Sequence, residues 1–96
     1  MTAVRLKSFE INVIKQVIHD LDSEAKIYLF GSRVDMNQKG GDIDLLIFSQ
    51  SLDYEDKLRI KMKLFEQIEE QKIDIVMAKN TNDPFVKIAL ERAVLL

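Results

Sequence analysis

Cysteine and tryptophan are absent from this 96-residue sequence, and histidine and proline occur once each, as His19 and Pro84. Without cysteine the chain has no disulfide, no thiolate nucleophile and no cysteine-ligated zinc site. A lone histidine also excludes a His-rich metal site. No apolar run approaches the roughly 20 residues of a membrane-spanning helix, and the N-terminal residues include no apolar signal segment. We therefore expect a cytoplasmic protein.

What the sequence contains is typical of a soluble globular domain. Hydrophobic residues make up 47% and charged residues 31% of the chain. The 14 basic and 16 acidic residues leave a net charge of −2. This balance argues against strong nucleic-acid binding, which usually rests on a basic excess. A chain of this length has room for one modest core, so we expect a single domain over residues 1–96.

Two segments in the first 70 residues have apolar residues at helical spacing. The first predicts a helix over residues 8–21, with Ser8 as its N-cap. The second predicts a helix that begins after the N-cap Asp53 and reaches about residue 70. The spacing in this second helix predicts an inward face formed by Leu58, Met62, Phe65 and either Ile68 or Leu64.

The C-terminal segment contains a strong helix start. Asp83 is a favourable N-cap, and Pro84 fits the first helical position, so we predict a helix over residues 84–95. Apolar residues cover more than one side of this helix. We therefore expect one side to meet the core and another to meet a partner or a second copy of the chain.

Short apolar runs predict three strands, over residues 26–30, 42–48 and 72–77. Helices and strands thus alternate along the chain, apart from a loop or short helix between the first two strands. That link, residues 32–41, is too short for the crossover helix that a parallel pair of strands needs. We therefore predict an α/β fold with a small mixed β-sheet and helices packed on it.

Aspartate stands at unusual positions in two of the predicted strands. Residues two apart in a strand share a face, so Asp42 and Asp44 project together, opposite Ile43. Two carboxylates this close repel each other unless a cation lies between them, and Mg²⁺ prefers one or two carboxylates together with phosphate oxygens. Asp74 repeats the pattern in the third strand. If this strand neighbours the second, the three aspartates form a site suited to two metal ions and phosphoryl transfer.

A turn with phosphate-binding chemistry precedes these carboxylates. Gly31 allows backbone N–H groups to approach a phosphate closely, and Ser32 adds a hydroxyl donor. Arg33 follows, with a fork-shaped guanidinium that suits phosphate oxygens. For Arg33, contact with phosphate and a surface ion pair both stay open.

The segment 30–48, FGSRVDMNQKGGDIDLLIF, resembles the Gly-Ser and Asp-x-Asp signature of the nucleotidyltransferase superfamily that shares the DNA polymerase β palm. The resemblance extends over nearly the whole chain, whose length is similar to that of the minimal nucleotidyltransferases. It implies a polymerase beta-like palm with ATP as substrate and two Mg²⁺ ions as cofactors. The residues it implies are Asp42, Asp44 and Asp74 as catalytic magnesium ligands, and Gly31 and Ser32 in nucleotide binding. Arg33 joins the nucleotide-binding candidates through its own chemistry.

Minimal members of this superfamily often pair with a HEPN-domain toxin, and some act as antitoxins by moving AMP from ATP onto a tyrosine of the toxin. The resemblance therefore implies a Mg²⁺-dependent protein adenylyltransferase in a toxin–antitoxin system, with a HEPN-domain protein as partner. Two alternatives stay open. One is a non-catalytic antitoxin that neutralises its partner by binding, and the other is the catalytic subunit of a small-molecule nucleotidyltransferase.

Overall fold

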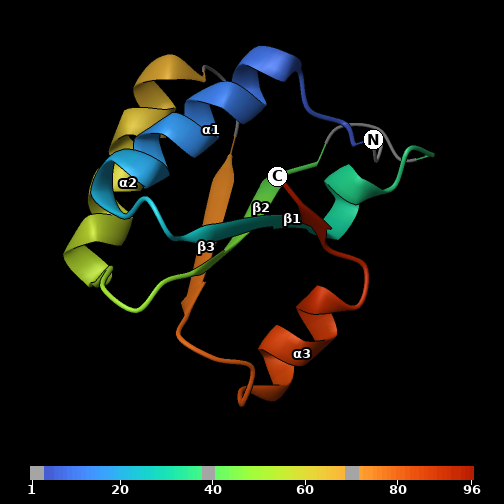
Figure 1. Cartoon of the computed structure of the whole chain (residues 1–96). Helices are drawn as coiled ribbons and strands as arrows, with labels where there is room; N and C mark the ends of the chain where they lie inside the picture. The colour runs from blue at the N-terminus through green and yellow to red at the C-terminus, as the bar shows by residue number, and fades with distance from the viewer. Residues whose placement is uncertain (1–3, 38–40, 69–71) are drawn as a thin grey trace.

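Helices and strands follow one another largely in the predicted order. The computed structural model describes residues 4–37, 41–68 and 72–96, and Figure 1 shows the course of the chain. The elements are α1 (Ser8–Leu21), β1 (Lys26–Phe30), the 3₁₀ helix η1 (Gly31–Val34), β2 (Ile43–Phe48), α2 (Tyr54–Gln67), β3 (Ile73–Ala78), α3 (Pro84–Leu90) and β4 (Val94–Leu95).

The four strands form one mixed sheet in the order β3-β2-β1-β4. β1 is antiparallel to both β2 and β4, whereas β2 and β3 are parallel. The parallel pair forms because α2 provides the crossover between its two strands. The mixed sheet predicted from the short link between the first two strands is thus confirmed.

Helices cover both faces of this sheet: α1 and α2 lie together on one face, and α3 lies on the other (Figure 1). The larger core lies under α1 and α2, where Ile43, Leu45 and Ile47 of β2 are completely buried. On the other face, Leu46 packs against Val86 and Ala89 of α3. Alternate residues of β2 therefore contact different helices, as the period of two in a strand requires.

The second helix, α2, turns a different face to the core from the one predicted. Its own buried residues are Ile60 and Leu64, and the C-cap Ile68 is buried beside them. The prediction is wrong for three side chains, whose exposed fractions are 44% for Leu58, 65% for Met62 and 62% for Phe65. The helix carries two apolar stripes, and packing on the sheet selects the one that contains Ile60. The helix ends at Gln67 with Ile68 as its C-cap, and residues 69 and 70 of its predicted length lie outside the described residues.

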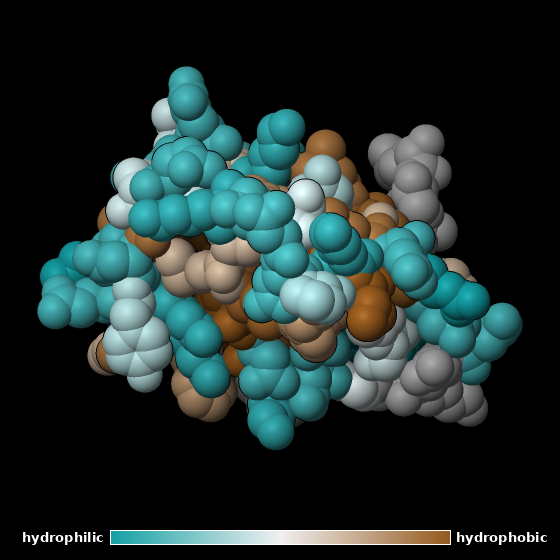
Figure 2. All heavy atoms as spheres, turned by 90° about the horizontal axis from the view of Figure 1, so that it is seen from below, coloured by the Kyte–Doolittle hydropathy of each residue, from teal (hydrophilic) through white to brown (hydrophobic). Residues whose placement is uncertain are grey.

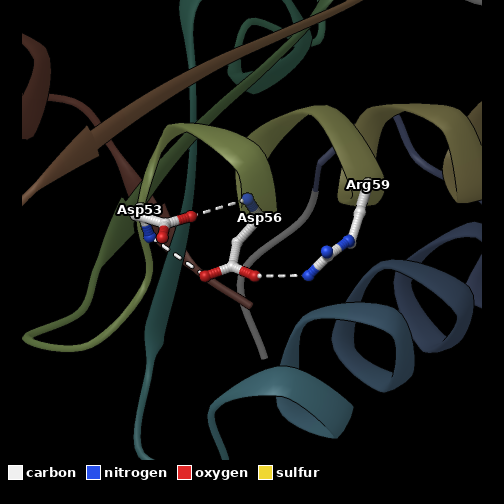
Figure 3. Close-up of polar contacts among 3 residues, drawn as sticks. All are labelled: Asp53, Asp56 and Arg59. Atoms are coloured by element: carbon white, nitrogen blue, oxygen red, sulfur yellow. Dashed lines mark hydrogen bonds and ion pairs between the residues drawn. The ribbon is translucent and has the colours of Figure 1, made fainter.

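A reciprocal pair of hydrogen bonds starts α2, as Figure 3 shows. The backbone N–H of Asp56 donates to Asp53 Oδ1 at 2.9 Å, and the N–H of Asp53 donates to Asp56 Oδ2 at 3.1 Å. Arg59 Nη1 lies 3.4 Å from Asp56 Oδ1. The bond from the Asp56 backbone is the main reason why the pKa of the Asp53 carboxyl is lowered. The N-cap predicted for this helix is thus confirmed.

The first helix has the predicted range, 8–21, but a different N-cap. Lys7 is its N-cap and Ser8 its first helical residue, so the N-cap prediction for Ser8 is wrong. The Lys7 N–H donates to Glu10 Oε1 at 2.8 Å. This carboxylate satisfies a backbone donor at the start of the helix, so that the serine hydroxyl is not needed there.

The last helix begins as predicted and ends early. Asp83 is the N-cap of α3 and accepts a hydrogen bond from Phe85 N, but the helix stops at Leu90 instead of residue 95. Val94 and Leu95 form β4 beside β1. Backbone pairing with β1 prevails over helical continuation there, because it satisfies donors and acceptors at the edge of the sheet.

The outer side of α3 keeps apolar residues in solvent. Phe85 and Ile88 have exposed fractions of 51% and 66%. Figure 2 shows the molecule from below, the side on which α3 lies, with hydrophobic surface at the centre of a largely hydrophilic face. The second apolar side predicted for this helix is therefore present. Within the described ranges, no helix has the length and hydropathy needed to cross a bilayer.

Candidate active site

Asp44 and Asp74 occupy neighbouring positions on the parallel strands β2 and β3, where they are register partners. We call these two residues the acidic pair. Phe30 of β1 is the partner of Asp44 on its other side, so the three residues form one row across the sheet. Their face is the one that α3 covers farther along, because Leu46, two residues after Asp44, belongs to the α3 cluster.

The acidic pair is electrostatically strained. Partial burial is the main cause that raises the pKa of the Asp44 carboxyl, and repulsion from Asp74 and then Asp42 adds to it. Lys72 opposes this shift, and its Nζ lies 3.9 Å from Asp42 Oδ2. The site therefore holds an excess of negative charge that a cation would relieve.

The geometry of the carboxylates differs from the predicted triangle. Among residues 4–37, 41–68 and 72–96, no three Asp, Glu, His or Cys side chains are grouped so that they could hold one metal ion together. Asp42 lies instead within ion-pair distance of Lys72. The donors nevertheless fit Mg²⁺, because this ion is commonly bound through one or two carboxylates, with water and phosphate oxygens in the other positions. The acidic pair offers two such carboxylates on adjacent strands.

The turn at Gly31 and Ser32 lies directly against the acidic pair. It starts η1 at the end of β1. Gly31 has a φ of 77°, in the left-handed region that favours glycine. A Cβ atom at this position would overlap the carboxylate of Asp44. The glycine thus permits a close approach between the predicted phosphate-binding turn and the predicted metal ligands.

The far end of the loop returns to the same turn. Gly41 has a φ of 90°, and a Cβ atom there would overlap Ser32 Oγ. The intervening residues 38–40 lie outside the described part of the chain. The serine hydroxyl therefore lies between the turn and the residue that precedes Asp42.

Two arginines, Arg5 and Arg33, hold the turn in place through hydrogen bonds to backbone carbonyls. Arg33 Nη1 donates to the Arg5 carbonyl at 2.7 Å, and its Nε donates to the Gly41 carbonyl at 3.2 Å. Arg5 in turn donates to the carbonyls of Ser32 and Asp35, both at 2.9 Å. Sequence reasoning missed these hydrogen bonds, because nothing in the sequence indicates that distant backbone carbonyls are the partners. The phosphate contact proposed for Arg33 stays a prediction.

A cavity of about 440 Å³ opens beside the turn. The end of β1 and η1 form one wall, and α3 with the residues after it forms the other. The rings of Phe30 and Phe85 meet edge to face with centroids 6.2 Å apart. Phe30 is also the register partner of Asp44, so the cavity lies next to Asp44, although neither residue of the acidic pair lines it. Its size is in the range of small-molecule sites, roughly 300–1,000 Å³.

A larger cavity, of about 570 Å³, lies at the opposite end of this sheet face, where Lys26 and Phe48 are register partners. Neither the acidic pair nor the Gly31–Ser32 turn lines it. Chemistry, rather than volume, selects the smaller cavity as part of the candidate active site.

Comparison with known families identifies the family of the chain. The family model described as polymerase beta, nucleotidyltransferase matches residues 12–96, a range that includes the acidic pair, the turn and α3. The chain belongs to this nucleotidyltransferase family. The search of individual curated proteins gives no match.

Membership of this family makes the protein a transferase of nucleotidyl groups with a polymerase beta-like fold. The four-stranded mixed sheet and its three helices agree with that fold. Nucleotidyltransferases of this family generally use nucleoside triphosphates and divalent metal ions. The acidic pair and the Gly31–Ser32 turn have the chemistry that these two ligands require.

Proposed function

We propose that this nucleotidyltransferase moves AMP from ATP to a hydroxyl group of a partner protein, a HEPN-domain toxin, and so acts as an antitoxin. The observation that carries the reaction is the direct register of Asp44 with Asp74, next to the Gly31–Ser32 turn. The partner and the nucleotide are inferred from the resemblance of the sequence to minimal nucleotidyltransferases.

The proposed transfer is a substitution at the α-phosphorus of ATP. The acceptor oxygen forms a bond to this phosphorus, while the bond to the oxygen that bridges to the β-phosphorus breaks and pyrophosphate leaves. The acceptor hydroxyl gives up its proton, which the Asp74 carboxylate accepts as general base. Asp74 suits this role because it lies directly beside Asp44 in the register of β2 with β3.

Asp44 and Asp74 would hold Mg²⁺ together, and Asp42, which the structure places beside Lys72, is assigned to the metal by the sequence resemblance alone. When bound, this ion supplies positive charge to the phosphoryl oxygens that become more negative during transfer. Support comes from the raised pKa of Asp44, which burial and the two neighbouring carboxylates cause. Lys72 offsets part of this negative charge through its ion pair with Asp42.

The turn would hold the terminal phosphates through the backbone N–H groups of Gly31 and Ser32 and the serine hydroxyl. The Ser32 carbonyl accepts hydrogen bonds from Arg5 Nη2 at 2.9 Å and from Asp35 N at 3.1 Å. These bonds fix the turn in one conformation before the nucleotide arrives. A preformed turn loses little conformational entropy when it binds phosphate.

The acceptor would dock on the palm itself, because an exposed apolar surface lies close to the acidic pair. The exposed side chains of Phe85 and Ile88 on α3 line the cavity next to the acidic pair. The solvent-exposed parts of these two side chains, outside the space left for the nucleotide, are the surface we propose for the acceptor, because exposed apolar patches are typical of interaction sites.

The test is to incubate the purified protein with ATP, Mg²⁺ and its neighbouring or co-purifying protein, and to read the products by intact mass. We expect the partner to gain one or more AMP units. The gain should disappear with Asp42→Asn and with Asp74→Asn, and it should persist with Asp20→Asn, a matched change of an exposed carboxylate on α1.

Each of the other outcomes favours a different function or mechanism. A stable complex without an adduct would favour an antitoxin that acts by binding alone. Neither complex nor adduct would favour a small-molecule acceptor. Full transfer by folded Asp74→Asn would remove Asp74 from the mechanism.

A further inference from the structure

We infer that Arg92 binds a terminal phosphate of the nucleotide, from the side of the cavity opposite the Gly31–Ser32 turn. This inference rests on the proposed function, since it concerns the same nucleotide. It assigns to the turn between α3 and β4 a role in recognising the triphosphate.

The first observation is the position of Arg92. It lines the 440 Å³ cavity together with Gly31 and Ser32, although it lies 60 residues later in the chain. Among the described residues that line this cavity, Arg92 is the one with a positively charged side chain. A nucleotide bound at the turn would therefore meet this guanidinium across the cavity.

The second observation is that the two arginines closest to the turn, Arg5 and Arg33, already bind backbone carbonyls. Arg33 donates through Nε and Nη1 to backbone carbonyls, and Arg5 donates through Nε and Nη2. Both guanidinium groups thus hold the turn in shape. Arg92, in contrast, is exposed and makes no hydrogen bond or ion pair with any described residue.

The third observation is that the backbone around Arg92 is anchored. Ala93 N donates to the Leu90 carbonyl at 3.3 Å, and Val94 pairs with Leu29 of β1. The position of the Arg92 backbone relative to the turn is therefore set by the sheet. Only the side chain has to become ordered on binding, which limits the entropic cost.

Charge completes the case. A triphosphate brings several negative charges to a site where Asp42, Asp44 and Asp74 already repel one another. The turn offers neutral donors, namely backbone N–H groups and one hydroxyl. An arginine fork binds two phosphate oxygens at once through charge-assisted hydrogen bonds, which are about twice as strong as neutral ones. Glu91 and Asp35 also line the cavity, and their carboxylates offset the positive charge of Arg92.

The test is calorimetric binding in Mg²⁺ of three probes: a non-hydrolysable ATP analogue, pyrophosphate and AMP. We expect Arg92→Gln to weaken the ATP analogue and pyrophosphate at least about tenfold and to leave AMP within about twofold. Lys87→Gln makes the same charge change on an exposed residue of α3 outside the cavity lining, and should bind all three like the wild type. Arg92→Lys keeps the charge without the fork and should fall in between.

Binding of the ATP analogue by Arg92→Gln within twofold of the wild type would overturn the inference and leave the proposed function intact. Equal weakening by Lys87→Gln would also overturn it, because net charge would then explain the effect. Failure of the wild type to bind any probe would refute the proposed function together with the inference. A circular dichroism melt of each variant shows whether it is folded, and exposed positions such as these usually tolerate substitution.

Discussion

Gly31 and Asp44 are in such close contact that a side chain at position 31 would occupy the space of the Asp44 carboxylate. The contact joins the end of β1 to β2 across the antiparallel pair, where Phe30 and Asp44 are register partners. The left-handed φ of Gly31 adds a second, independent requirement for glycine. A double-mutant cycle separates the two requirements.

We expect Gly31→Ala to lower the free energy of unfolding by about 2 kcal/mol or more in the wild-type background, from backbone strain plus overlap with Asp44. In an Asp44→Ala background the overlap is gone, and the cost should fall to about 1 kcal/mol. Urea unfolding of the four proteins measures the coupling. Strictly additive costs would show that the carboxylate does not press on this position.

The repulsion at the acidic pair predicts an effect of metal on stability. Burial, Asp74 and Asp42 raise the pKa of Asp44, so at neutral pH its ionised form costs folding free energy. Asp44→Asn should therefore raise the melting temperature in the presence of EDTA. Mg²⁺ at ten times its Kd should stabilise the wild type by about 1.4 kcal/mol and the variant much less. Equal Mg²⁺ stabilisation of both proteins would place the ion elsewhere.

The orientation of α2 predicts a contrast between two neighbouring apolar residues. Leu64 is completely buried, so Leu64→Ala should destabilise the protein by about 2–5 kcal/mol through lost contacts and a cavity. Met62 is 65% exposed, and Met62→Ala should change stability by less than about 0.5 kcal/mol. Chemical denaturation of both variants tests this. A larger loss for Met62→Ala would mean that the sequence-predicted face is the inward one.

The link between α1 and β2 predicts the response to acid. Ser49 Oγ donates to Asp22 Oδ2 at 2.5 Å, and this bond is the main cause that lowers the pKa of Asp22. An acid with a lowered folded pKa contributes stability above its unfolded pKa of about 3.9, and loses it as the pH falls through the folded value. Wild-type stability should therefore drop below about pH 4.

Asp22→Asn removes the titrating group and should flatten this drop, and Ser49→Ala should act in the same direction. Unfolding curves between pH 3 and pH 7 give the comparison. If both variants lose stability in parallel with the wild type, the bond between these two side chains has no part in acid sensitivity.

The acidic residues were predictable because a strand has a fixed period of two. Once residues 43–48 are recognised as a strand, Asp44 must lie opposite Ile43 and Leu45, whatever else the chain does. From the sequence alone, the aspartates were expected to come together only if the third strand neighboured the second. In the structure β3 does pair with β2, and Asp44 lies beside Asp74. The period of a strand therefore predicts the face on which Asp44 lies, whereas the packing of the whole fold determines that Asp74 is its neighbour.

The inward face of α2 was not predictable in the same way. Leu58, Met62 and Phe65 recur at helical spacing, and so do Ile60 and Leu64. A helical period identifies both stripes without saying which one meets the sheet. Similarly, no local signal ends α3 at Leu90, because β4 forms only through its pairing with a strand far back in the chain.

The pairing of β2 with β3 also fixes which groups can meet at the acidic pair. The same ladder that aligns Asp44 with Asp74 aligns Ile43 with Ile73 and Leu45 with Ile75 on the opposite face. A slip of β3 by one residue would turn Asp74 toward the apolar layer under α1 and α2, at a cost of several kcal/mol for an unpaired charge. The buried pairs Ile43–Ile73 and Leu45–Ile75 therefore fix the register that places the two carboxylates side by side. Volume changes at Ile73 or Ile75 will be transmitted to their spacing, although neither isoleucine shares their face.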